Sequence, residues 1–160
     1  MKKNITALLI AFIMLLSVLP VPAAAASSGV MIYEVYSSGG YASDKNEAPY
    51  KNCYIVLYNA SGSDVSLSGW SIRVAGGTSN TIDAASTVNL SGTIDANKYY
   101  VIKGGVCADH KGTVYGRELD FNANLDAPNL KLYRKAGKIA LCSGGGDTQL
   151  SSRGGSVVDF

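Results

Sequence analysis

This chain of 160 residues has a single histidine and a small net charge, and each of these two features argues against a class of function. His110 is the only histidine, so catalysis with an imidazole base has a single residue to draw on, with no nucleophile next to it in sequence. The chain has 14 basic and 12 acidic residues. A protein that binds nucleic acid through its phosphates normally has a clear basic excess. Composition therefore favours neither histidine-based catalysis nor nucleic-acid binding.

Motifs for metals, phosphates and nucleophilic catalysis are lacking as well. Cys107 and His110 would supply half of a zinc site, but a second pair of ligands is missing. The polar residues 44–47 lack the spaced carboxylates of a calcium loop. The glycines of residues 143–146 are not followed by a helical pattern that could hold a phosphate. The sequence therefore predicts no catalytic residue, no metal site, no cofactor and no enzyme activity.

The first 26 residues have the three-part layout of a secretory signal peptide. Lys2 and Lys3 precede an apolar run over residues 7–19, and small residues follow up to Ala26. The run is shorter than the roughly 20 apolar residues that span a membrane. We expect cleavage near Ala24 or Ala26, a secreted or cell-surface location, and no membrane span in the mature chain. Loss of both lysines leaves that chain neutral, so nucleic acid is not an expected partner.

The remaining residues, 27–160, are expected to form one all-β domain. Short apolar runs alternate with polar segments, and the chain has 18 glycines and 10 tyrosines. Residues 53–58 place Cys, Ile and Leu on one side and Tyr, Val and Tyr on the other, which is the period of a β-strand. Several such strands predict an immunoglobulin-like β-sandwich of two mainly antiparallel sheets. The polar, Gly-rich loop 37–49 is expected not to pair.

Trp70 is the only tryptophan and follows Leu67 in the next predicted strand, with Ile72 and Val74 after it. Gly69 before it allows the backbone to bulge or to approach another segment closely, where a bulky indole has to be directed inward. We therefore predict that Trp70 is a central residue of the hydrophobic core.

Several short motifs follow one another along the chain: the strand end at residues 34–36, the runs at 54–59 and 67–72, and the later segments 90–94 and 99–102. Taken in this order, they resemble the lamin-tail domain of secreted bacterial proteins. The resemblance runs from about Val30 to the last residue. Two positions depart from it, because Val56 and Cys53 stand where the family usually has acidic residues.

This resemblance implies a non-catalytic interaction or targeting module. Bacterial lamin-tail domains accompany secreted or surface hydrolases, and the domain of nuclear lamins serves protein and nucleic-acid contacts. An unknown protein, cell-surface or polysaccharide partner is then expected. Two alternatives stay open: the chain is the N-terminal accessory part of a longer extracellular hydrolase, or a fragment of a secreted nuclease or phosphatase. We also expect the last strand, residues 157–160, to be cut short or completed by a partner strand.

A different class of function is carbohydrate or cell-wall binding by exposed tyrosines. Tyr54 and Tyr58 share one side of a predicted strand, and Tyr36, Tyr41 and Tyr50 lie near that strand in sequence. We take Tyr36, Tyr54 and Tyr58 as the candidate ligand face. Such rings either stack on sugars or close the ends of the sandwich with their hydroxyls outward.

An exported chain with three cysteines is expected to contain a disulfide. Cys107 and Cys142 lie in polar, Gly-rich surroundings at strand ends, whereas Cys53 begins an apolar alternation. We therefore predict a disulfide between Cys107 and Cys142, with Cys53 buried as a small hydrophobic residue.

Overall fold

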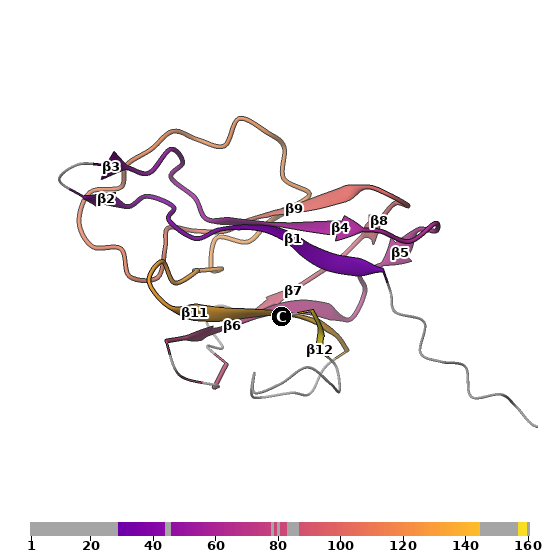
Figure 1. Ribbon diagram of the computed structural model, residues 1–160. Coiled ribbons are helices and arrows are strands. Elements are labelled where there is room, and N and C mark those ends of the chain that lie inside the picture. The colour runs from indigo at the N-terminus through magenta and orange to yellow at the C-terminus, as the bar shows by residue number, and fades with distance from the viewer. Residues whose placement is uncertain are drawn as a thin grey trace, which may run out of the picture.

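The computed structural model of the protein describes residues 29–43, 46–77, 79, 81–82, 87–144 and 157–159. Its regular elements are all β-strands, and two four-stranded sheets lie over each other as the layers of a sandwich (Figure 1). The predicted all-β, immunoglobulin-like sandwich is therefore confirmed. The predicted signal peptide, residues 1–26, lies outside the described residues. Within the described ranges no helix is long and apolar enough to cross a membrane.

The first sheet has the strand order β1-β4-β9-β10. Its pairs are antiparallel except for the short parallel pair of β9 and β10. Its strands are β1 (Val30–Tyr36), β4 (Tyr54–Asn59), β9 (Tyr99–Lys103) and β10 (Leu125–Asp126).

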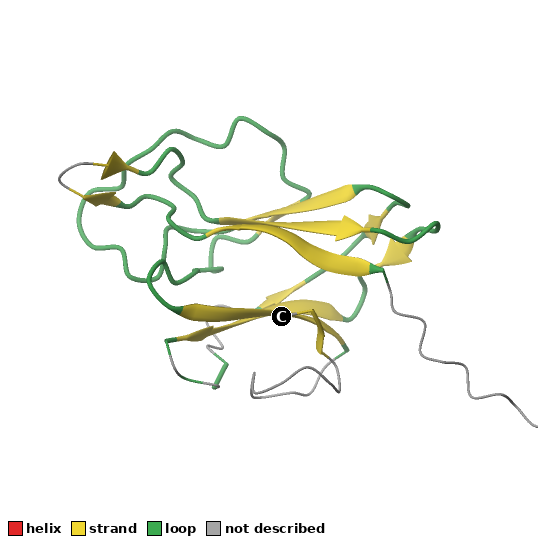
Figure 2. Ribbon diagram, in the orientation of Figure 1, coloured by secondary structure: helices red, strands yellow, loops and turns green. Residues whose placement is uncertain are grey.

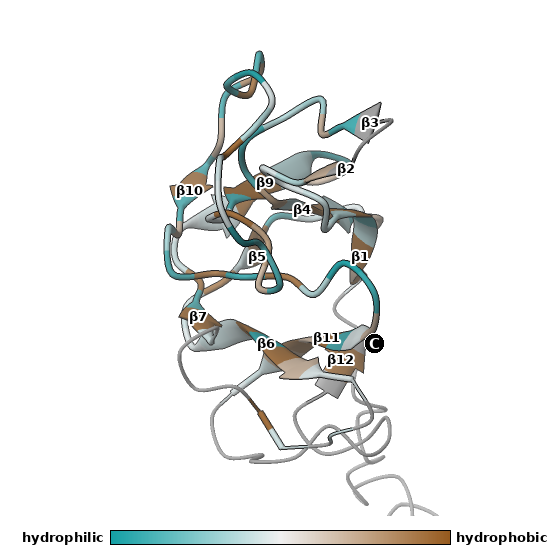
Figure 3. Cartoon of the chain, turned by 90° about the vertical axis from the view of Figure 1, so that its left-hand side faces the viewer, coloured by the Kyte–Doolittle hydropathy of each residue, from teal (hydrophilic) through white to brown (hydrophobic). Residues whose placement is uncertain are grey.

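The second sheet has the order β12-β11-β6-β7, and all of its pairs are antiparallel. Its strands are β12 (Val157–Asp159), β11 (Gly137–Ser143), β6 (Trp70–Gly76) and β7 (Val88–Asn89). Figure 3 shows the two layers from the end, with the hydrophobic colour concentrated on the strands and on the segments between the layers.

Two further strand pairs are short. One joins β5 (Val65–Ser66) to β8 (Thr93–Ile94), and the other joins β2 (Ala42–Ser43) to β3 (Asn46–Glu47). The second pair lies inside the loop that we expected not to pair, so that expectation is wrong. Backbone hydrogen bonds do not depend on side-chain polarity, and the bond from Ala48 N to Tyr41 O, 2.7 Å long, closes this small hairpin.

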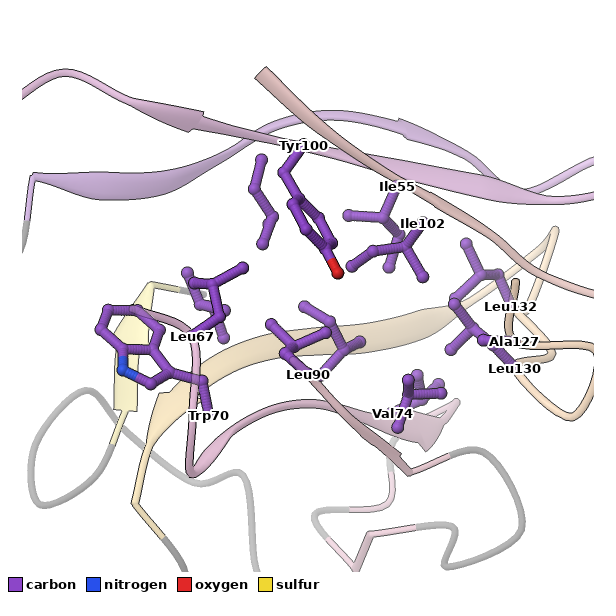
Figure 4. Packing of buried hydrophobic residues seen from close by; sticks show 14 of the residues in the cluster. Ile55, Leu67, Trp70, Val74, Leu90, Tyr100, Ile102, Ala127, Leu130 and Leu132 are labelled. Atoms are coloured by element: carbon purple, nitrogen blue, oxygen red, sulfur yellow. The ribbon is translucent and has the colours of Figure 1, made fainter. Parts of the chain in front are cut away.

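The core lies between the sheets and follows the alternation of β4. Cys53, Ile55 and Leu57 are fully buried there, while Tyr54 and Tyr58 point to the other side of the sheet. Figure 4 shows side chains from both layers meeting, together with Ala127, Leu130 and Leu132 from the segment between β10 and β11. This segment fills one end of the sandwich without forming a strand of its own.

The structure places Trp70 in this core, where its exposed fraction is 9% (Figure 4). A tight turn precedes it, in which Trp70 N donates to Leu67 O at 3.0 Å. Gly69 has φ +78° in this turn, a conformation that residues with a side chain rarely adopt. The glycine thus lets the chain turn immediately before β6, so that both Leu67 and Trp70 are buried.

Candidate binding surface

Three tyrosines meet on the outer face of the first sheet, the face that points away from the core. They are Tyr33 on β1, Tyr58 on β4 and Tyr99 on β9, three strands that are neighbours in the sheet. The ring centroids of Tyr33 and Tyr99 are 5.0 Å apart, and those of Tyr58 and Tyr99 are 4.8 Å apart. We call these three residues the exposed tyrosine cluster.

A β-bulge places Tyr33 on this face. The register of β1 against β4 shifts between Ile32 and Glu34, so two consecutive residues, Tyr33 and Glu34, face outward. Sequence alternation alone did not indicate this, and we did not identify Tyr33 or Tyr99 as candidates. The signal for Tyr99 was present, since Tyr99 and Tyr100 are adjacent in a strand and must point to opposite faces.

The exposed tyrosine cluster is open to solvent. The exposed fractions are 58% for Tyr33 and 50% for Tyr99, and the neighbouring Met31 is also exposed. A hydrogen bond with the Tyr33 hydroxyl raises the pKa of Tyr99, which favours the neutral phenol of Tyr99. The cluster therefore combines apolar rings with polar, uncharged tips.

A second aromatic group lies further along the same sheet face, where a loop covers it. Tyr54 packs against Tyr36, Tyr50 and Phe121 with centroid distances of 5.1, 6.2 and 5.2 Å. Phe121 comes from the long segment between β9 and β10, which rises above the outer side of the sheet in Figure 1 and is drawn as loop in Figure 2. We call these four residues the covered aromatic cluster.

Tyr54 is buried in this cluster, with only 8% of its surface exposed. Its hydroxyl donates a 2.7 Å hydrogen bond to Oε1 of Glu34. Burial, together with this bond to the carboxylate, strongly raises the pKa of Tyr54. Tyr54 is thus a structural residue, and its assignment to the ligand face is corrected.

The other predicted tyrosines are divided between separate places. Tyr36 is stacked on Tyr54 in the covered aromatic cluster, and burial raises its pKa. Tyr58 alone of the predicted face belongs to the exposed tyrosine cluster. Tyr41 lies elsewhere, under the guanidinium of Arg134 at 3.7 Å from the ring centroid.

Contacts with the segment just before β4 hold the covering loop, residues 104–124, over the sheet. Lys51 Nζ lies 3.1 Å from Glu118, the hydroxyl of Tyr50 donates to Asp120 at 3.0 Å, and the Tyr50 backbone forms a bridge with Arg117. The ion pair of Arg117 Nη2 with Asp120, 2.9 Å long, lies within the loop itself. The charged pairs are exposed, so each contributes little by itself, but the contacts of Tyr50 and Lys51 together place the loop where Phe121 reaches Tyr54.

The structure corrects the predicted disulfide. All three cysteines are buried, and no disulfide joins them. Cys107 lies in the main core with Cys53, whereas Cys142 lies in a separate small cluster with Ala75 and Ala140. Adjacent residues of β11 point to opposite faces of the second sheet, so Cys142 points away from the core that contains Cys107. Burial raises the pKa of Cys107 to about 11 and also raises that of Cys53.

Metal-binding groups do not gather within the described ranges. No set of three His, Cys, Asp or Glu side chains there could hold a metal ion. His110 Nε2 lies 3.0 Å from the carbonyl oxygen of Gly112, next to it in the same loop. The single histidine of the chain thus contacts its own loop, and the described residues provide no donor set for a metal ion.

Comparison with known protein families agrees with this architecture. The family model described as Lamin Tail Domain matches residues 23–157. The chain belongs to the lamin-tail domain family. The tyrosines of the exposed cluster and the covering loop both lie inside the matched residues of this lamin-tail chain. A search of the curated proteins finds no match.

Proposed function

We propose that this lamin-tail chain is an exported, non-catalytic binding module that attaches to polysaccharide through the exposed tyrosine cluster. The observation that carries the proposal is the open triangle of Tyr33, Tyr58 and Tyr99 on three adjacent strands. Aromatic rings offer an apolar face to the C–H side of a sugar, and phenolic hydroxyls offer hydrogen bonds to its hydroxyl groups.

Rigidity supports this proposal. The rings stand on the central strands β4 and β9 and on β1, so their positions are set by the sheet and little side-chain freedom is lost on binding. The cluster carries no charge of its own, which suits a neutral polymer better than nucleic acid. A tyrosine-rich surface also fits a protein partner, and a protein that is retained on none of the polysaccharides would favour that case over the proposal.

The test is retention on insoluble polysaccharide and on peptidoglycan, beside a DNA gel shift over a series of salt concentrations. The variant is the double substitution Tyr33→Ala with Tyr99→Ala, and the matched control is Tyr115→Ala, an exposed tyrosine of the covering loop. We expect the double variant to lose about tenfold or more of its affinity, since that factor corresponds to only ~1.4 kcal/mol. Retention that is equal for all three proteins, or binding seen only to DNA and lost at moderate salt, contradicts the proposal.

A further inference from the structure

A pocket of about 300 Å³ opens between the two sheets at the end of the sandwich where β11 begins. Its walls come from both layers, with Val35 from β1 and Val74 and Ile139 from β6 and β11. Val74 is fully buried, while Val35 is 40% exposed at the opening. The pocket thus leads from solvent to the apolar core, and it is separate from the outer face that carries the exposed tyrosine cluster.

The polar part of the lining is basic. Arg134 and Lys135 both line the pocket, and its described lining residues include no aspartate or glutamate. Within the described part of the chain, Asp109 contacts this group through an ion pair of 3.5 Å between its Oδ2 and Arg134 Nη2. One carboxylate against two cations leaves the pocket with a net positive charge.

The guanidinium of Arg134 is held in place yet is not fully paired. Its carbon lies 3.7 Å from the centroid of the Tyr41 ring, and Asp109 Oδ1 accepts a 3.4 Å hydrogen bond from the Arg134 backbone N–H. The side-chain Nε is buried and makes no hydrogen bond. Because Nε has almost no surface open to a ligand and Nη2 is paired with Asp109, an incoming anion would meet the part of the Arg134 side chain that stays exposed, 23% of its surface.

We propose that this pocket binds a small monocarboxylate that carries an apolar group. The carboxylate lies beside the cationic side chains of Arg134 and Lys135, and the apolar group lies between Val35, Val74 and Ile139. The size suits a short chain or a single apolar side chain, since ligand pockets begin at about this volume. Two sources offer this chemistry: a short fatty acid, and the C-terminal residue of a peptide.

The test is titration of the mature chain, followed by NMR of the Val35, Val74 and Ile139 methyl groups. The probes are two matched pairs, hexanoate against hexanamide and N-acetylleucine against N-acetylleucinamide. We expect the carboxylates to shift these methyl signals and the amides to bind about tenfold more weakly, as for loss of a hydrogen bond to a charged group. The carboxylate with the higher affinity identifies the source: hexanoate stands for a short fatty acid, and N-acetylleucine stands for the C-terminal residue of a peptide.

Three variants complete the test. Lys135→Gln should weaken binding several-fold, whereas Lys131→Gln, an exposed lysine outside the lining, should not. Ala136→Phe adds a ring to an exposed lining residue and should block the pocket without changing its charge; a melting curve verifies that each variant is folded. Equal binding of acids and amides, equal binding of inorganic phosphate, or unchanged binding by folded Ala136→Phe would overturn the proposal. None of these outcomes depends on polysaccharide binding at the outer face.

Discussion

Single residues determine which aromatic side chains are available to a ligand. The bulge between Ile32 and Glu34 brings Tyr33 onto the outer face, and Phe121 removes Tyr54 from it. Both effects depend on contacts between segments far apart in the chain. Residue patterns within one strand could predict that Ile55 and Leu57 are buried, but not that a loop some 65 residues later would cover their neighbour Tyr54.

Trp70 provides a direct test of the core at this scale. We expect Trp70→Ala to lower the free energy of unfolding by ~3 to 5 kcal/mol, because it removes a large buried aromatic side chain and leaves a cavity. Urea denaturation measures the change, and Tyr115→Ala is the surface control. A melting temperature within a degree or two of the parent would show that Trp70 is not part of the core in solution.

The buried thiol of Cys107 predicts a pH dependence of stability. Burial raises its pKa from 9.0 to about 11, so the unfolded chain loses this proton first as the pH rises. The associated stability is fully present below pH 9 and is lost between about pH 9 and pH 11. Denaturation midpoints over this range should therefore fall, and they should fall less steeply for Cys107→Ala. Buried tyrosines such as Tyr100 also lower the stability of both the parent and Cys107→Ala as the pH rises. The test is therefore the difference between the two curves, and parallel curves would contradict the role given to Cys107.

At the scale of elements, the covering loop is the feature that sequence patterns could not place. The alternation of β4 and the position of Trp70 in β6 follow from local residue order, and the sandwich could be predicted from them. The course of residues 104–124 over the sheet depends on ion pairs and ring contacts between distant positions, such as Lys51 with Glu118. The disulfide prediction failed for the same reason: which face of β11 contains Cys142 depends on its register with β6.

Phe121 should hold this loop in place. Phe121 and Tyr115 have nearly equal exposed fractions, 38% and 37%, but Phe121 packs against Tyr50 and Tyr54. We expect Phe121→Ala to speed tryptic cleavage within the loop several-fold, while Tyr115→Ala leaves the rate near that of the parent. The initial rate of cleavage on a gel measures this. Equal rates for the two variants would mean that the ring contacts do not restrain the loop.

The segment between β1 and β2 packs closely against the backbone just before β4. A Cβ atom at Gly39 would clash with the backbone nitrogen of Cys53, whereas one at Gly62 would meet nothing within 4 Å. Gly39→Ala therefore has to shift backbone, and we expect it to cost ~1 to 3 kcal/mol of stability, as overpacking typically does. Gly62→Ala is the matched control and should change stability little. Comparable midpoints in urea would contradict the predicted contact.

For the whole molecule, the strand order divides the chain into two interlocked parts. β11 comes after the covering loop, yet it lies inside the second sheet, where it pairs over seven positions with β6 from before the loop. Leu130 and Leu132, also from after the loop, are fully buried in the common core. The part after the loop therefore supplies a strand of the second sheet and core residues that the part before the loop needs for its own packing.

From this strand order we expect the protein to stay assembled even when its backbone is cut in the covering loop. Lys111 is exposed in the covering loop and offers trypsin a site at which to cut. A singly cut molecule should give two bands on a denaturing gel but elute as one species in size-exclusion chromatography, because sheet pairing and core contacts hold the pieces together. Separate elution of the fragments would contradict this. The same reasoning makes the two pieces suitable for expression as separate chains that reconstitute one domain, a split protein whose assembly reports that its halves have met.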